Sequence, residues 1–103
     1  MTQSNSFTAK QKPPALSSGD TIAIVSPGRW TEESLLRNWT RELERFGYNV
    51  FLHPQNFLRF NQFAGSVADR ISAIHDVFED QRNRAIMLSK AGNGALHLLD
   101  QLD

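Results

Sequence analysis

The sequence predicts an α/β domain in which three parallel strands alternate with helices. Short apolar segments recur at 21–25, 48–52 and 85–88, and each has the length of a buried strand. Between them lie segments whose apolar residues recur at three- and four-residue steps, as on one face of a helix. Helical crossovers of this length imply right-handed connections and a parallel sheet. The predicted class is Rossmann-like, and so small a sheet resembles half of a larger one.

The first predicted strand, 21–25, is continuously apolar, which is typical of a strand covered by helices on both faces. Gly19-Asp20 marks its start. Pro27-Gly28 ends it, because proline has no N–H group to donate to a β-ladder.

The first predicted helix follows directly. Thr31 is its expected N-cap, and Glu32 and Glu33 favour the positive end of its dipole. Gly47 is expected to end the helix in a left-handed conformation. The apolar stripe of this helix consists of Leu35, Leu36, Trp39, Leu43 and Phe46.

The segment 53–64, which follows the second predicted strand, has no clear period. It is too aromatic for a solvated linker, so it either folds back on the domain or is covered by another part of the protein. Its large apolar residues are Phe57, Leu58, Phe60 and Phe63.

The second predicted helix begins with a capping box, because Ser66 is followed three residues later by Asp69. Its expected buried stripe consists of Ile71, Ile74, Val77 and Phe78.

A glycine-containing loop, Lys90 to Gly94, follows the third predicted strand and is expected to lead into a third helix. At such a turn, backbone N–H groups point into a crevice, where they can bind a phosphate or stabilise an oxyanion. The alternative is a tight turn whose glycines only satisfy backbone geometry. The candidate donors are Ala91, Gly92 and Asn93, and the helix would begin near Ala95 and bury Leu96, Leu98, Leu99 and Leu102.

Ser26 and Arg29 are candidate substrate contacts, because ligands gather at the carboxyl ends of parallel strands. The alternative for Ser26 is a hydroxyl that caps its own turn. It is not expected to be a nucleophile, since no histidine is placed locally to activate it. A dinucleotide site is not favoured, because the Gly-x-Gly-x-x-Gly pattern is absent.

The composition excludes some classes of function. The chain has 103 residues and 11 basic against 11 acidic side chains, so no overall field favours nucleic acid or an acidic membrane. We expect residues 1–12 to form a flexible polar tail and 13–103 a single domain. There is no cysteine, and neither a signal peptide nor a bilayer-spanning run is recognisable, so the cytoplasm is the expected location.

No metal and no other cofactor is expected. The three histidines, His53, His75 and His97, fall on different predicted elements and lack the spacing of metal ligands.

From residue 14 onwards the chain resembles the N-terminal domain of the LD-carboxypeptidases, serine peptidases that trim peptidoglycan peptides and include relatives that give immunity to a peptide-nucleotide antibiotic. The order and spacing of four blocks carry the resemblance. The blocks are Pro14 to Pro27, Phe46 to Val50, Ala64 to Asp80 with its Ala-Gly, Arg70 and Phe78-x-Asp80, and Ala85 through the glycine loop to Leu102-Asp103.

The resemblance implies that the catalytic serine, glutamate and histidine all lie outside this chain, which therefore contains no catalytic residue and is expected to be inactive alone. It also implies that residues 91–93 provide oxyanion donors. The family loop has Arg-Gly-Gly-Tyr-Gly where this chain has Lys-Ala-Gly-Asn-Gly. Alanine at position 91 would cost about 1 kcal/mol if a positive φ is needed there.

The leading hypothesis is thus the N-terminal part of a serine LD-carboxypeptidase. Its partners would be a muropeptide or similar peptide, a C-terminal catalytic domain and a second copy in a homodimer. The rival hypothesis is a non-catalytic binding or self-association module that uses the sheet edge and the aromatic segment 57–63.

Overall fold

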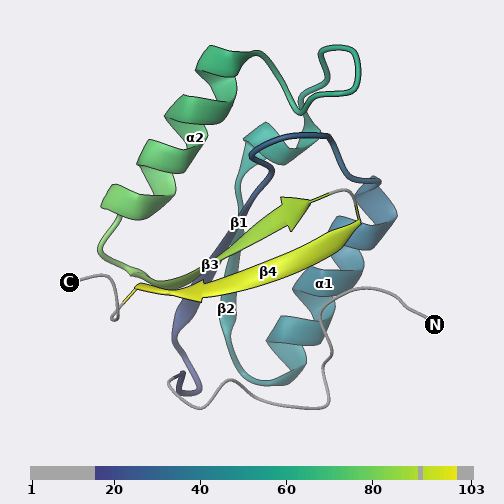
Figure 1. The fold of residues 1–103 in the computed structure, drawn as a ribbon. Coiled ribbons are helices and arrows are strands. Elements are labelled where there is room, and N and C mark those ends of the chain that lie inside the picture. The colour runs from purple at the N-terminus through teal and green to yellow at the C-terminus, as the bar shows by residue number, and fades with distance from the viewer. Residues whose placement is uncertain (1–15, 91, 100–103) are drawn as a thin grey trace.

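A computed structural model describes residues 16–90 and 92–99, and its centre is a four-stranded sheet with the order β2-β1-β3-β4 (Figure 1). The predicted tail, 1–12, lies outside the described residues. Strand β1 (Thr21–Val25) is parallel to β2 (Asn49–Leu52) on one side and to β3 (Asn83–Lys90) on the other. The three predicted parallel strands are therefore confirmed.

The predicted third helix is wrong. Residues 93–98 form strand β4 (Asn93–Leu98), antiparallel to β3, and Lys90 pairs with Asn93 across a two-residue connection. Gly92 has a φ of 91°, which suits so tight a turn. Leu96 and Leu98 alternate with His97, and this short run fits a strand period as well as a helical step. Leu102, which was expected in the helix, lies outside the described residues.

Helices cover the two faces of the sheet (Figure 1). Helix α1 (Glu33–Arg45) packs on the face that contains Ile22, Ile24 and Met87, and α2 (Val67–Glu79) packs on the opposite face. The core under α1 is the larger one. Its helical residues are Leu36, Trp39 and Leu43, whereas α2 buries only Ala73 and Val77.

Of the three predictions about helix ends, one is wrong and two are confirmed. Helix α1 begins after Glu32, which makes no side-chain capping bond, and the buried hydroxyl of Thr31 bonds to that of Ser89 instead. Thr31 is therefore not the N-cap. Gly47 does adopt a positive φ just after α1, and Ser66 with Asp69 forms the expected capping box at α2.

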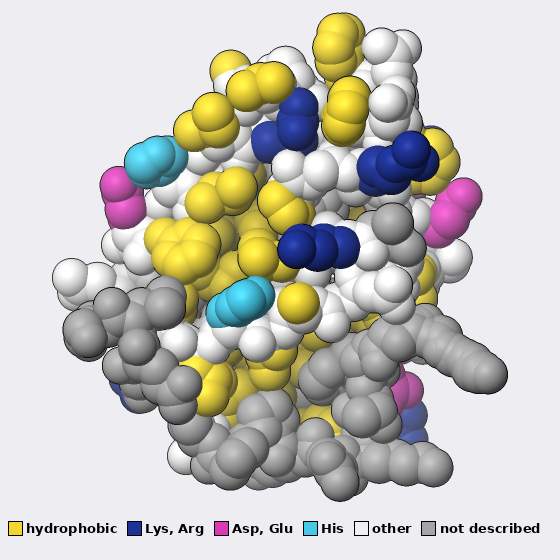
Figure 2. Space-filling view, in the orientation of Figure 1, with side chains coloured by type: hydrophobic (Ala, Val, Ile, Leu, Met, Phe, Trp, Pro, Cys, Tyr) yellow, Lys and Arg dark blue, Asp and Glu magenta, His cyan; other side chains and the backbone are white. Residues whose placement is uncertain are grey.

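The expected buried stripe of α2 is only partly correct. Val77 is buried, but 51% of Ile71 and 43% of Phe78 are exposed. The helix contacts the sheet along the line of Ala73 and Val77, so the stripe of larger side chains lies to one side of that line. Figure 2 shows apolar side chains gathered on this side, over α2 and the neighbouring strands.

The segment 53–64 folds back on the domain, as one of its two predicted alternatives required. It begins with the short helix η1 (Pro54–Phe57). Its far end then returns to the loop after β1, where the N–H of Ala64 donates to the carbonyl of Gly28 at 2.9 Å and Phe63 forms a bridge with Arg29.

The hairpin turn gives a testable contrast between two glycines. We expect Gly92→Ala to lower the free energy of unfolding by about 1 kcal/mol, because a side chain at its positive φ is strained even with space around it. Gly28→Ala is the control, since no atom lies within 4 Å of the added Cβ and its φ is not positive. Urea denaturation measures both, and equal losses would contradict the proposed strain.

Candidate functional site

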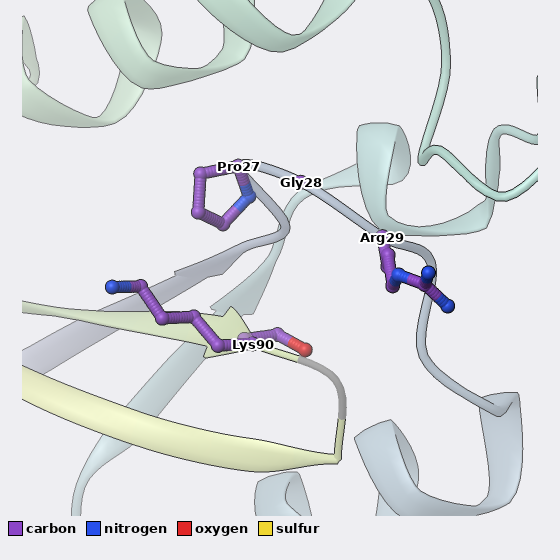
Figure 3. Close-up of a pocket in the computed structure, with 5 residues that line it drawn as sticks. Pro27, Gly28, Arg29 and Lys90 are labelled. Atoms are coloured by element: carbon purple, nitrogen blue, oxygen red, sulfur yellow. The ribbon is translucent and has the colours of Figure 1, made fainter.

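The carboxyl ends of β1 and β3 lie side by side and form the candidate site. Val25 pairs with Leu88, so the residues after β1 run alongside the end of β3. A pocket of about 340 Å³ opens between them. Its lining residues are Pro27, Gly28, Arg29, Ser89 and Lys90 (Figure 3).

Two exposed cations flank this pocket. In Figure 3 the side chains of Lys90 and Arg29 come from opposite walls and extend in opposite directions. The segments 21–31, 53–68 and 81–99 contain no Asp or Glu, although the whole chain has 11 acidic residues. The lining of the pocket, which includes two cations and no acidic residue, therefore favours an anionic ligand over a cationic one.

Ser26 lies directly before the pocket and is fully buried. Its hydroxyl donates to Oδ1 of Asn56 at 2.7 Å, and its main-chain N–H donates to Oε1 of Gln55 at 3.1 Å. Of the two interpretations of Ser26, this geometry favours the structural one, although the bond goes to Asn56 and not to its own turn. A substrate contact by Ser26 stays a prediction.

Gln55 and Asn56 of η1 have side-chain amides whose oxygen and nitrogen atoms all form hydrogen bonds. Gln55 donates from Nε2 to the carbonyls of Ser26 and Ala64 at 2.7 and 2.6 Å. Asn56 donates from Nδ2 to the carbonyls of Ile24 and His53, both at 2.7 Å. Because each amide bonds to the end of β1, together they fix the direction in which the chain leaves the sheet.

Gln55 and Asn56 were not among the residues predicted for the site. A signal was present, since two amide residues stand just after the second predicted strand, at the same end of the sheet as Ser26. Side-chain amides can bond main-chain groups that are left free where a strand ends.

Arg70 of α2 contacts the loop after β1, which forms one wall of the pocket. Its guanidinium donates to the carbonyl of Pro27 at 3.3 Å and lies 4.6 Å from the ring centre of Phe63. On the other side of the same loop, Arg59 stacks on Trp30 at 3.9 Å. The loop after β1 is thereby held between α2 and the folded-back segment.

The candidate oxyanion donors lie at the hairpin between β3 and β4, next to Lys90. Ala91 is outside the described residues. Gly92 is in the turn, and Asn93 begins β4 as the partner of Lys90. The turn therefore joins two strands, and no helix dipole follows it. The oxyanion role of residues 91–93 stays a prediction.

A second pocket, of about 140 Å³, lies at the amino end of the sheet. Beside it, Arg82 donates to both carboxylate oxygens of Asp80, at 3.0 and 2.7 Å. These hydrogen bonds lower the pKa of Asp80 to about 2. Ligands of open parallel sheets bind at the carboxyl ends of the strands, so the first pocket is the better candidate site.

Within residues 16–90 and 92–99, no three His, Asp or Glu side chains are grouped so as to hold a metal ion. In the same part of the chain, none of the helices has the length and apolarity needed to cross a bilayer.

Comparison with known proteins identifies the family. Residues 22–103 match the model of the LD-carboxypeptidase N-terminal domain. The chain therefore belongs to the LD-carboxypeptidase family, as its sequence resemblance indicated. A probable murein peptide carboxypeptidase from Bacillus subtilis (strain 168) is 26% identical over 97 residues. The match covers 94% of this chain but 30% of that relative, so the chain spans less than a third of the relative's length.

The amide network gives a prediction about stability. Asn56→Ala is expected to lower the free energy of unfolding by about 2 kcal/mol, because it leaves the buried Ser26 hydroxyl without its partner and the Ile24 carbonyl with the His53 N–H as its remaining donor. The matched control is Asn38→Ala on the exposed face of α1, expected within about 0.5 kcal/mol of the parent. Similar urea midpoints for the two variants would contradict a structural role for Asn56.

The Asp80–Arg82 pair gives a prediction about pH. The folded pKa of Asp80, about 2, lies below its ordinary value of 3.8, so the pair stabilises the fold above that value. This stabilisation is lost as the pH falls toward 2. We therefore expect Asp80→Asn to be less stable than the parent at neutral pH and the gap to close in acid. Urea midpoints across this range check it, and a gap independent of pH would contradict it.

Proposed function

We propose that this chain forms one side of the substrate cleft of a serine LD-carboxypeptidase-type hydrolase that acts on muropeptides. The observation that carries the proposal is the pocket at the carboxyl ends of β1 and β3, flanked by Arg29 and Lys90 and bordered by the hairpin turn. Family membership supports the reaction class. The nucleophile would come from outside these residues, in a C-terminal catalytic domain.

The charge around the pocket supports a peptide substrate with a free carboxylate. Arg29 provides a fork of N–H donors that suits a carboxylate, and Lys90 provides a second positive charge on the opposite wall. Ser26 precedes the lining residue Pro27, and its predicted contact with the substrate would require its buried hydroxyl to leave Asn56.

The proposed chemistry is acyl transfer. A serine hydroxyl attacks the amide carbonyl of the substrate, and histidine takes the serine proton while glutamate orients the histidine. The carbonyl oxygen then carries a negative charge, which N–H groups of residues 91–93 would stabilise. The amine product leaves with a proton, and water hydrolyses the acyl-enzyme to release the shortened peptide. The proposed setting is peptidoglycan recycling in the cytoplasm.

Binding of peptide to the 103-residue chain tests the proposal. We expect a muramoyl tetrapeptide with a free terminal carboxylate to shift the amide NMR signals of Gly28, Arg29 and residues 89–94. The same peptide with an amidated terminus should bind more weakly. Arg29→Ala should weaken binding by about tenfold, the value of one charge-assisted hydrogen bond. No D-alanine should be released, because the chain would supply no nucleophile.

Arg41→Ala is the matched control, since Arg41 is exposed on α1, away from the pocket. It should leave peptide binding unchanged. Equal binding of the free and amidated peptides would refute the carboxylate site. Absence of any binding would favour the rival hypothesis of a module that does not recognise muropeptides, and release of D-alanine would place a nucleophile within this chain.

A further inference from the structure

His53, the residue between β2 and η1, uses both nitrogens of its ring. Its Nδ1 accepts the main-chain N–H of Gln55 at 3.0 Å, and this bond caps the first turn of η1. Its Nε2 lies 3.0 Å from Oδ2 of Asp76 in α2. The His53 side chain is 15% exposed, so solvent reaches the ring. The ring therefore links η1 to α2 at a place where it can exchange a proton with water.

These two contacts define the state of the ring. An N–H group can donate only to an imidazole nitrogen that carries no hydrogen, so Nδ1 of His53 is unprotonated. In the neutral ring the hydrogen is then on Nε2, which donates it to Asp76. A charged histidine carries hydrogens on both nitrogens. It can keep the bond to Asp76, but it cannot accept the N–H of Gln55.

Asp76 is the charged side chain that directly contacts the ring. The described strands β1 and β2 and the helix η1 contain no Lys, Arg, Asp or Glu. The other titratable residues of α2 have contacts elsewhere, and they are Asp69, Arg70, His75 and Glu79. Phe51 lies on the other side of the ring, at 5.5 Å between ring centres, and the pocket beside Phe51 contains the Asp80–Arg82 pair. The Asp76 carboxylate favours the charged ring, whereas the bond from Gln55 favours the neutral one.

The cap is directly connected to the amide network at the end of β1. Gln55, whose N–H is bound by His53, also donates from its side chain to the carbonyls of Ser26 and Ala64. Asn56 follows in η1 and accepts the hydroxyl of Ser26. Ser26 precedes Pro27, which lines the pocket. The first turn of η1 therefore sets the position of both amides that hold this wall.

We propose that His53 is a proton-sensitive cap of η1. In its neutral state the ring closes the first turn and holds the amide network in place. When Nδ1 takes a proton from water, the Gln55 N–H loses its acceptor, while Asp76 keeps the ring in position. Histidine is the side chain that ordinarily changes its charge between about pH 5 and 8. The wall of the pocket is therefore held firmly above this range and more loosely below it.

The position of the hydrogen on the ring is the first test, and it needs no variant. Nitrogen NMR of the isotopically labelled 103-residue chain distinguishes a ring nitrogen that carries a hydrogen from one that does not. At about pH 8 we expect the hydrogen of His53 on Nε2 and none on Nδ1. A hydrogen on Nδ1 at that pH would overturn the proposal.

Hydrogen exchange tests the consequence. Protection of the Gln55 N–H, taken relative to its intrinsic exchange rate at each pH, should fall about tenfold from about pH 8 to about pH 5, as for the loss of one cap. His53→Asn should abolish this pH dependence, because asparagine is a good N-cap and does not titrate. His75→Asn is the matched control, since His75 is exposed on α2 and pairs with Glu79, and it should behave like the parent. Circular dichroism verifies that both variants fold.

Protection of the Gln55 N–H that does not change with pH in the parent would overturn the proposal. So would an equal fall in His53→Asn, or the loss of the pH dependence in His75→Asn, which would assign the effect to another group. The ring measurement on the parent still decides if a variant does not fold. Neither measurement involves a peptide, so the outcome is independent of the proposed function.

Discussion

The buried amide network of η1 is the interaction on which the rest of this structure depends. Gln55 and Asn56 come from the segment after β2, yet they bond the main chain of β1 at Ile24 and Ser26. Main-chain groups at a strand end leave the ladder and need partners when they are buried. Two side-chain amides meet that need here, so the chain can turn outward at Pro27 and form the wall of the pocket.

The elements most accessible to sequence analysis were those with local causes. Residues 22–25 are all apolar, and Ser66 with Asp69 forms a capping box within four residues, so neighbouring residues determine both features. Thr31 had an equally good local pattern for an N-cap. Its hydroxyl bonds Ser89 instead, which lies 58 residues away in the chain, and a pattern of neighbours carries no information about that contact.

The same distinction explains what could be predicted of the candidate site. Arg29 was found because strand ends collect ligands in parallel sheets, and the structure does place it at the pocket. The loop 91–93 was expected before a helix, but four residues from Ala95 to Leu98 fit either period. The pairing of β4 with residues 85–90 of β3 decides in favour of a strand, and the tight turn that allows this pairing contains Gly92. Arg70 was not predicted as a brace, since its contact with Pro27 is tertiary.

The hairpin turn connects the candidate site to β4, the last strand of the sheet among the described residues. Because only residues 91 and 92 lie between Lys90 and Asn93, the turn that borders the pocket also fixes which residues of β4 face outward. A longer connection would allow the strand to shift by one residue, and every side chain of β4 would then change face. Leu96 would leave the core under α1, where it packs with Met87 and its neighbours. The packing of Leu96 on the α1 face and the pairing of β4 with β3 therefore both favour the two-residue turn over a longer one. The position of the proposed oxyanion loop and the face to which each side chain of β4 points are thus two consequences of one short connection.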